Sequence, residues 1–332
     1  MKTLEKMEGL KQKGKDLMVE LFRETMIFLE EVKIKSKDLL KTNYELGMFH
    51  LNKQNLSDAK MRFKMVSMIN PNYLDVFYQL ARCYQYSSKI EKSIDCLAKC
   101  ARGEKVEYRL NLLKKLFIDE IPIEVLEEDF DFLASTYDAQ SKSEDFHRSN
   151  NIISYLKEIL ARDDRINDTF SILDVGCGNG DCGKILKTSL NISFLEGIDI
   201  SQEMIKICES QILDQGISRK TYDKLIKMDF TALQQGHDKK FDIIFVCNAL
   251  EYGRNISKVI LSLRSLLNSN GYLAIQVHKS HDNKDISFDH EKGHFCFGED
   301  YLKSICKDNN LKLSEFALTH QADDEMMIVI IQ

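Results

Sequence analysis

Apolar and polar positions alternate in blocks along the second half of the chain. Five short apolar runs, separated by amphipathic stretches with helical spacing, occupy residues 172–175, 192–200, 225–230, 241–250 and 272–278. Short apolar runs that alternate with helices predict buried strands in a parallel, doubly wound sheet. Two more apolar segments follow at 312–318 and 326–331, and the connection between them is too short for a crossover helix. One strand must therefore run antiparallel, in a terminal hairpin of a seven-stranded sheet.

Helix signals fill the gaps between the predicted strands. Residues 150–161 and 299–309 have amphipathic spacing, and Ser201 is suited to cap the helix that follows it. Residues 255–268 form another amphipathic stretch, which Gly271 is expected to stop. The second half of the chain is thus predicted to be an α/β unit.

The first half of the chain shows helical spacing throughout. A helix is predicted at residues 17–40. The segments 40–73 and 74–107 then repeat one pattern with the period of about 34 residues that marks tetratricopeptide (TPR) repeats. Small residues recur where paired helices must approach closely, at Gly47, Ala59, Ala81 and Ser93. The pattern resembles two TPR units; a plain array of helical hairpins without a binding groove is the alternative.

Proline marks the predicted domain boundary. Pro122 is one of only two prolines in the chain, and it follows the helical repeats. Proline breaks a helix and restricts the residue before it, so a linker is expected there. The predicted domains are an all-α, TPR-like domain at residues 1–121 and an α/β domain at residues 122–332.

Composition narrows the class of protein. The 332 residues, 43% hydrophobic and 30% charged, suffice for two globular domains, and the net charge of −6 gives no basic surface for nucleic acid. No apolar run approaches the roughly 18 residues of a membrane span, and the charged N-terminus has no signal core. The nine cysteines form no C-x-x-C pair. We therefore predict a cytoplasmic protein with reduced cysteines and with neither nucleic-acid nor membrane partners.

Candidate chemistry centres on the turn after the first apolar run. Gly176, Gly178 and Gly180 lie within five residues, between a predicted strand and a predicted helix. Glycines let the backbone turn tightly and approach a ligand, while the start of the helix offers free N–H groups. About twenty residues further on, Asp199 ends the second predicted strand, where a carboxylate can accept hydrogen bonds from both ribose hydroxyls. The spacing predicts a cofactor that contains a nucleoside.

The sequence of this turn distinguishes between two possible classes of cofactor. The dinucleotide fingerprint requires a glycine where this chain has Asp181, which weakens the case for an NAD-dependent dehydrogenase. With Asp174 on the first strand and glycine at position 180, the turn resembles motif I of class I S-adenosylmethionine (SAM) methyltransferases. The resemblance implies a methyltransferase with a Rossmann-like sheet and SAM as its cofactor.

The resemblance also implies which residues hold the cofactor. Asp199 stands in the ribose-binding position of the family, Asp229 in the position that accepts from the adenine amino group, and Phe230 can pack on the ring. The full predicted set is Asp174, Gly176, Cys177, Gly178, Gly180, Asp199, Ile200, Met204, Asp229, Phe230, Cys247 and Asn248.

The resemblance extends from Phe130 to the end of the chain. Residues 130–138, FDFLASTYD, are similar to a family segment that often covers the bound cofactor. With the helical repeats ahead of it, the chain resembles bacterial TPR-bearing methyltransferases. Such relatives often carry an arginine and a histidine in the loop after the fifth strand. Residues 293–298 are GHFCFG in this chain, so the role of those two residues does not transfer.

Methyl transfer depends on positioning more than on acid–base chemistry, because the sulfonium is already activated. If the acceptor must lose a proton, His278 at the end of the fifth strand is the best-placed base, with His281, His290 and His294 behind it. Asn248 is the second catalytic candidate, since it is expected where the methyl donor meets the acceptor. The spacing of the four histidines also suggests zinc, but no supporting pattern frames them, and no metal is predicted.

Two classes of function follow from these patterns. The leading hypothesis is a SAM-dependent methyltransferase whose acceptor is a protein or peptide docked on the TPR helices, or a small metabolite. The alternative is a non-catalytic TPR interaction protein whose second domain serves as a SAM-binding sensor. A dehydrogenase is a weaker third option.

Overall fold

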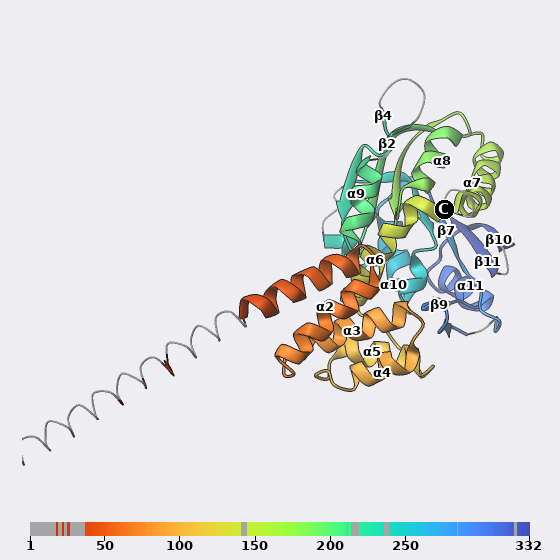
Figure 1. Cartoon of the computed structure of the whole chain (residues 1–332). Coiled ribbons are helices and arrows are strands. Elements are labelled where there is room, and N and C mark those ends of the chain that lie inside the picture. Colours follow the sequence, from red (N-terminus) through yellow and green to blue (C-terminus); the bar gives the residue numbers. More distant parts are fainter. Residues whose placement is uncertain are drawn as a thin grey trace, which may run out of the picture. The chain divides into compact units, whose positions relative to one another are not determined.

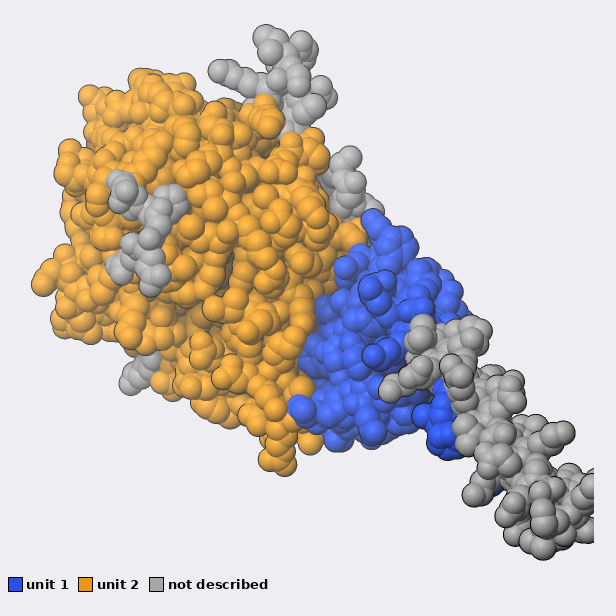
Figure 2. All heavy atoms as spheres, turned by 90° about the vertical axis from the view of Figure 1, so that its left-hand side faces the viewer, with its two compact units in different colours: residues 1–101 blue, residues 102–332 orange. Residues whose placement is uncertain are grey.

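The chain divides into two compact units. The computed structural model describes residues 37–140, 145–210, 212–213, 219–235, 239–283, 285–321 and 324–332, with four single residues before position 37. One unit comprises residues 1–101 and the other residues 102–332 (Figure 2). The helix predicted at residues 17–40 lies largely outside the described residues.

The described part of the first unit consists of helices joined by short turns. Residues 37–52 form a helix, followed by α2 (Leu56–Ile69), α3 (Asp75–Tyr86) and α4 (Ile90–Leu97). A Cβ atom on Gly47 would lie 2.5 Å from the Phe63 ring. The Ser93 hydroxyl donates to the Ala81 carbonyl oxygen at 2.8 Å. Small residues thus permit close helix packing, as predicted, whereas the assignment of these helices to the TPR class stays a prediction.

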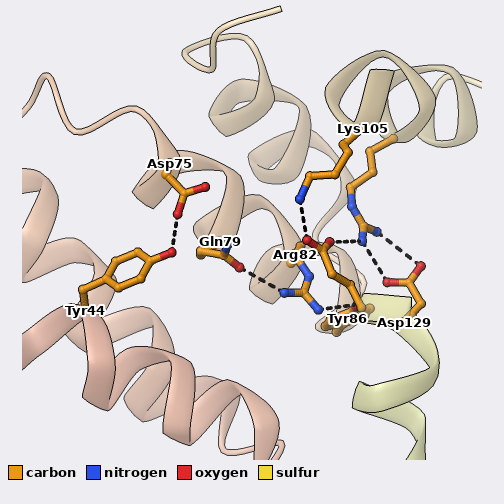
Figure 3. A network of polar contacts seen from close by, with 9 residues as sticks. Tyr44, Asp75, Gln79, Arg82, Tyr86, Lys105 and Asp129 are labelled. Carbon is orange, nitrogen blue, oxygen red and sulfur yellow. Dashed lines mark hydrogen bonds and ion pairs between the residues drawn. The ribbon is translucent and has the colours of Figure 1, made fainter. Parts of the chain in front are cut away.

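Polar side chains link the helices within each unit (Figure 3). In the first unit, the Tyr44 hydroxyl donates to Asp75 of α3 and so links two helices, whereas the Arg82 guanidinium donates to the Gln79 side-chain oxygen at 3.0 Å within α3. In the second unit, the fully buried Arg109 of α5 (Glu104–Leu113) pairs with Asp129 of α6 (Ile123–Gln140) at 2.8 Å. The ion pair fixes α5 against α6.

The observed boundary between the compact units lies about twenty residues before the predicted one. Tyr108, Ile118, Ile121 and Val125 are all buried in a core that they share with the sheet of the second unit. Pro122 does not sit in a free linker, because its carbonyl oxygen accepts from the Val125 and Leu126 amides at the start of α6. Residues 102–121 therefore group with the sheet, which sequence periodicity alone does not reveal.

The second unit contains the predicted seven-stranded sheet. Its order is β10-β11-β7-β6-β1-β2-β5. Strand β11 is antiparallel to both of its neighbours, and the other pairings are parallel, so the predicted seven-stranded sheet with a terminal antiparallel hairpin is confirmed. The strands are β1 (Thr169–Val175), β2 (Asn191–Asp199), β5 (Lys224–Lys227), β6 (Phe241–Cys247), β7 (Leu267–His278), β10 (Leu313–Gln321) and β11 (Asp324–Ile331).

Helices cover both faces of this sheet (Figure 1). Successive strand residues point to opposite faces, so Ile172 joins one apolar core and Leu173 joins the other. The first core is completed by α7 (Asp145–Arg162), α8 (Asp181–Ser189) and α9 (Gln202–Ser210), and the second by α10 (Ile256–Ser265) and α11 (Glu299–Asp308). Burial of both faces explains the unbroken apolar runs in the sequence.

Several predicted boundaries are wrong for local reasons. The third strand ends at Lys227 rather than at residue 230, because the Asp229 carboxylate accepts from the Thr231 amide and begins η1 (Phe230–Gln235). The fourth strand ends at Cys247, before a residue with positive φ and η2 (Leu250–Tyr252). Gly271 lies inside β7 and does not stop a helix: a Cβ there would lie 2.9 Å from the Asp242 carbonyl oxygen.

The remaining elements are two short hairpins. Strand β3 (Ile212–Leu213) pairs with β4 (Arg219–Lys220), and β8 (Ser287–Asp289) pairs with β9 (His294–Cys296). The second hairpin occupies the histidine-bearing segment that the sequence predicted as a loop. None of the helices in the described residues combines the length and the apolar character that a bilayer span requires.

The position of the unit boundary can be tested by truncation. A chain that begins at Arg102 should unfold cooperatively. A chain that begins at Ile121 loses the buried Tyr108 and Ile118 and should be less stable by at least about 3 kcal/mol. Urea unfolding followed by circular dichroism measures both. Equal stability of the two chains would show that α5 is not part of this core.

Candidate active site

A cavity of about 440 Å³ lies at the carboxyl ends of the five neighbouring parallel strands β5, β2, β1, β6 and β7. This is the edge at which open α/β sheets bind their ligands. Ten of the twelve predicted cofactor residues line it: Gly176, Cys177, Gly178, Asp199, Ile200, Met204, Asp229, Phe230, Cys247 and Asn248. The fold thus brings together residues that lie far apart in the sequence, although their role in binding stays a prediction.

The glycine turn has the conformation that its sequence requires. Gly176, Gly178 and Gly180 all have positive φ, at 70°, 52° and 87°. A Cβ on Gly176 would lie 2.5 Å from the Cβ of Ala249, whereas a Cβ on Gly178 would meet no atom within 4 Å. Gly176 therefore serves close packing between loops, and Gly178 leaves the wall of the cavity open to a ligand.

Asp199 holds this turn in place. One carboxylate oxygen accepts from the Gly178 amide at 2.8 Å, and the other accepts from the Ser201 amide at 2.8 Å. Burial raises the pKa of Asp199, while the hydrogen bonds from Ser201 and Gly178 oppose that shift. The side chain still lines the cavity, so the same carboxylate can shape the turn and contact a ligand.

Two predicted residues lie behind the cavity wall. Gly180 precedes α8 as its N-cap. Asp174 is 1% exposed and accepts from the Tyr222 hydroxyl at 2.6 Å. Burial raises the pKa of Asp174 to about 7, with the Tyr222 hydrogen bond opposing the shift and the Asp199 charge adding to it. The structure assigns Asp174 a place beneath the turn and not in the lining.

One end of the cavity is apolar and is covered by α6. Phe130 and Leu126 of this helix line the cavity together with Met228, and the Phe130 ring meets Tyr252 edge-on at 4.9 Å. Asp131 anchors the helix, because it accepts from the Ser201 hydroxyl at 2.5 Å. The segment predicted to cover the cofactor therefore lies at the cavity, while its last residues, 136–138, have side chains outside the described set.

The other end of the cavity is polar and includes residues that the sequence did not single out. His278 Nδ1 lies 2.7 Å from Oε1 of Glu251, and His278 Nε2 lies 3.6 Å from Oδ2 of Asp324. The His294 ring lies 4.2 Å from the His278 ring, between centroids. Lys292 pairs with Asp324. Glu251, Lys292 and Asp324 have no motif around them, so only the fold reveals that they meet.

Asn248, the second catalytic candidate, lies where β6 ends. Its φ is 55°, which is unusual for a residue other than glycine. Its amide donates to the Gln276 carbonyl oxygen at 3.0 Å, and the two side-chain amides lie 3.2 Å apart. A neighbouring strand thus holds this strained residue at the rim of the cavity, where functional residues often occur.

The structure places the four predicted histidines at two neighbouring cavities. His278 and His294 line this cavity, and all four histidines line a second one. No group of three or more His, Cys, Asp or Glu side chains within the described ranges is arranged to hold a metal ion.

Comparison with known proteins shows what this part of the chain is similar to. Residues 166–327 match the sequence profile of a family described as a methyltransferase domain. The match covers 162 of the 332 residues of the chain. The match agrees with the predicted methyltransferase class for these residues.

A curated relative is similar to a shorter part of the chain. It is a ubiquinone biosynthesis O-methyltransferase of Pasteurella multocida (strain Pm70), 32% identical over 110 residues, which cover 31% of this chain and 43% of that protein. The match therefore spans less than half the length of the relative.

Two solved structures show how far the likeness extends. The 1,6-didemethyltoxoflavin-N1-methyltransferase of Burkholderia thailandensis is 13% identical, with a TM-score of 0.49 over 70% of this chain and 91% of that one. The magnesium protoporphyrin IX methyltransferase of Synechocystis PCC 6803 is 16% identical, with a TM-score of 0.46 over 65% and 99%.

The raised pKa of Asp174 predicts a pH-dependent stability. The pKa rises from 3.8 to about 7 on folding, so the folded state binds the proton more tightly. Stability from this group is present below about pH 4 and is lost as the pH rises to about 7. Relative to Asp174→Asn, the wild-type free energy of unfolding should fall across this window by an amount on the order of 4 kcal/mol.

Urea unfolding at several pH values measures this difference. Asp242→Asn is the matched contrast, because hydrogen bonds from Ser171 and Asn268 outweigh the effect of burial and lower the pKa of Asp242. The wild type should therefore gain stability over the Asp242 variant as the pH rises. A pH-independent difference between the wild type and Asp174→Asn would contradict the assignment.

Proposed function

We propose that this chain binds SAM in the cavity at the carboxyl ends of the sheet and transfers the methyl group to an acceptor. The observation that carries the proposal is the open glycine turn at Gly178, held by Asp199 at the edge of the sheet. The match to a methyltransferase domain supports it.

The two ends of the cavity suggest how SAM lies in it. The ribose is assigned to Asp199, and the adenine to the apolar end, with Asp229 and Phe230 beneath α6. The methionine part then follows the glycine turn, and the methyl group reaches the polar end at Cys247 and Asn248. This orientation brings the methyl group to the end where His278 lies.

Methyl transfer mainly requires the protein to position the acceptor against the methyl group. The sulfonium is a good leaving group, so the cavity has to hold the acceptor atom in line with the methyl carbon and keep water away. His278 is the proposed base for an acceptor that must lose its proton, and Asn248 the proposed polar contact beside the methyl group. The curated relative is named an O-methyltransferase, which makes an oxygen acceptor one candidate.

The helices of the first unit are proposed to form a TPR-like surface for a protein partner. Helix α2 exposes Met61, Met65 and Met68 at helical spacing, and flexible methionines suit surfaces that adapt to a partner. In this proposal the acceptor is a protein or peptide docked there, or a small metabolite. A SAM-binding sensor without turnover is the alternative function.

Isothermal titration calorimetry with SAM, with its demethylated product and with NAD tests the cofactor. Asp199→Ala should weaken SAM binding by about 10-fold or more, since a hydrogen bond to a charged group contributes about 1.5 to 3 kcal/mol. Asp199→Asn keeps the shape but loses the charge, and should have an intermediate effect. NAD should not bind.

The control is the fold of each variant, because Asp199 also holds two backbone amides. Circular dichroism and the unfolding midpoint must show that the variant is folded at the temperature of the titration. Wild-type affinity of a folded Asp199→Ala variant would refute the assignment, and SAM binding without methyl transfer to any acceptor would favour the sensor.

A further inference from the structure

Four of the nine cysteines gather around the glycine turn. Cys177, Cys182 and Cys247 line the cavity, and directly behind its wall the Cys208 thiol donates to the Gly178 carbonyl oxygen at 3.0 Å. The function proposed for the cavity uses none of these thiols as a reactive group. Thiols that lie close together can be oxidised to a disulfide. The cluster is therefore a candidate redox site.

Cys182 and Cys247 are the pair that an oxidant can reach. Both are partly exposed at the cavity, whereas Cys177 and Cys208 are buried, with 3% and 2% of their surface exposed. Redox-sensing cysteines are accessible to solvent and often lie beside a second cysteine that completes the disulfide. The buried pair meets only the second of these conditions, and the partly exposed pair meets both.

The fold brings the two partly exposed thiols together from separate elements. Cys247 is the last residue of β6, and Cys182 lies in the first turn of α8. Val175 pairs with Val246 between β1 and β6, so the glycine turn after β1 starts beside Cys247. Helix α8 begins directly after this turn, and its first turn returns to the same cavity. The two thiols form a hydrogen bond there.

The position of the proton gives each thiol a separate role. The hydrogen bond to Cys182 raises the pKa of Cys247, and burial raises it further, so Cys247 keeps its proton and donates to the Cys182 sulfur. Cys182 lies among the free N–H groups at the start of α8, which favour negative charge. The thiolate is the form that attacks an oxidant. Cys182 is therefore the thiol that reacts first, and Cys247 is the thiol that completes the disulfide.

We propose that Cys182 and Cys247 form a redox-sensitive thiol pair, which peroxide converts into a disulfide that closes the cavity to SAM. The effect on SAM rests on the proposed function. A disulfide holds its sulfurs about 2.0 Å apart, so it draws the start of α8 toward the end of β6. In the orientation proposed above, the methionine part and the methyl group of SAM occupy the space between these two elements. Bound SAM should in turn cover both thiols and protect them.

The oxidation balances in atoms and electrons. The Cys182 thiolate attacks one oxygen of hydrogen peroxide, the O–O bond breaks, and the hydroxide that leaves takes up the proton that Cys182 has lost. The Cys247 sulfur then attacks the sulfenic acid on Cys182, the S–S bond forms and the S–O bond breaks. The departing hydroxide takes the Cys247 proton. The two thiols thus lose two electrons, one peroxide gains them, and two waters are released.

The test treats the reduced full chain with hydrogen peroxide, blocks the remaining thiols with iodoacetamide and maps the tryptic peptides by mass spectrometry. The peptide 166–184 carries Cys182 and the peptide 241–254 carries Cys247, so the two linked together are the expected product. Fragmentation should locate the bridge at Cys182 and not at Cys177. A link between 166–184 and 207–219 would report Cys208 instead. Saturating SAM should slow the formation of the expected link at least about tenfold, because occupied cavities do not react.

Calorimetry measures the consequence for SAM. Peroxide should raise the Kd of the wild type for SAM at least about tenfold, and dithiothreitol should restore it. In Cys182→Ser the link should be absent, and peroxide should leave that variant's own Kd unchanged within about twofold. Cys100→Ser is the matched control, because Cys100 is also partly exposed but does not line this cavity, and it should respond like the wild type. The peptide map of the wild type decides the linkage even if Cys182→Ser does not fold.

Several outcomes would overturn the inference. They are the absence of the link at every peroxide concentration that leaves the chain folded, a bridge at Cys177 or Cys208 only, a crosslink between two chains, an oxidised chain that binds SAM as tightly as the reduced one, and a rate of oxidation that saturating SAM does not change. Failure of the reduced wild type to bind SAM would instead refute the proposed function, while the linked peptides would still form, so the two failures are distinguishable.

Discussion

The bond between the Asp199 carboxylate and the Gly178 amide is the constraint on which the site depends. It joins the tip of β2 to the turn after β1, and the second oxygen of the same carboxylate binds the Ser201 amide at the start of α9. Ser201 in turn donates to Asp131, which anchors α6 over the cavity. The Asp199 carboxylate thus fixes the glycine turn and the start of α9 directly, and it fixes α6 through the hydroxyl of Ser201.

The sheet supplies the rigidity that this arrangement requires. Alternate residues of its central strands enter two separate apolar cores, so each strand is fixed from both faces. At the carboxyl ends, where the apolar packing stops, polar side chains can converge without disturbing either core. Loops at those ends can therefore carry chemistry at little cost to the sheet.

The sequence predicted the sheet well because its signals are local. Apolar runs identify the strands, and the glycines at 176, 178 and 180 indicate the tight turn, in which the structure shows positive φ values. It could not reveal the place of α5, because Arg109 and Tyr108 find their partners beyond Pro122. Nor could it reveal Glu251: that residue is brought to His278 by the pairing of β6 with β7, a contact that no local pattern encodes.

Three of the seven buried side-chain atoms that lack a hydrogen-bond partner among the described residues lie near the carboxyl ends of the strands. Oδ1 of Asp174, Oε1 of Gln276 and Oε2 of Glu251 are buried without a hydrogen-bond partner among the described residues, and Asn248 beside them has a strained φ. Each of these features lowers stability, and all of them lie within a strand or a turn of the cavity wall. The two apolar cores offset that cost. The sheet is therefore stable enough to tolerate unsatisfied polar groups at the edge where the fold predicts chemistry.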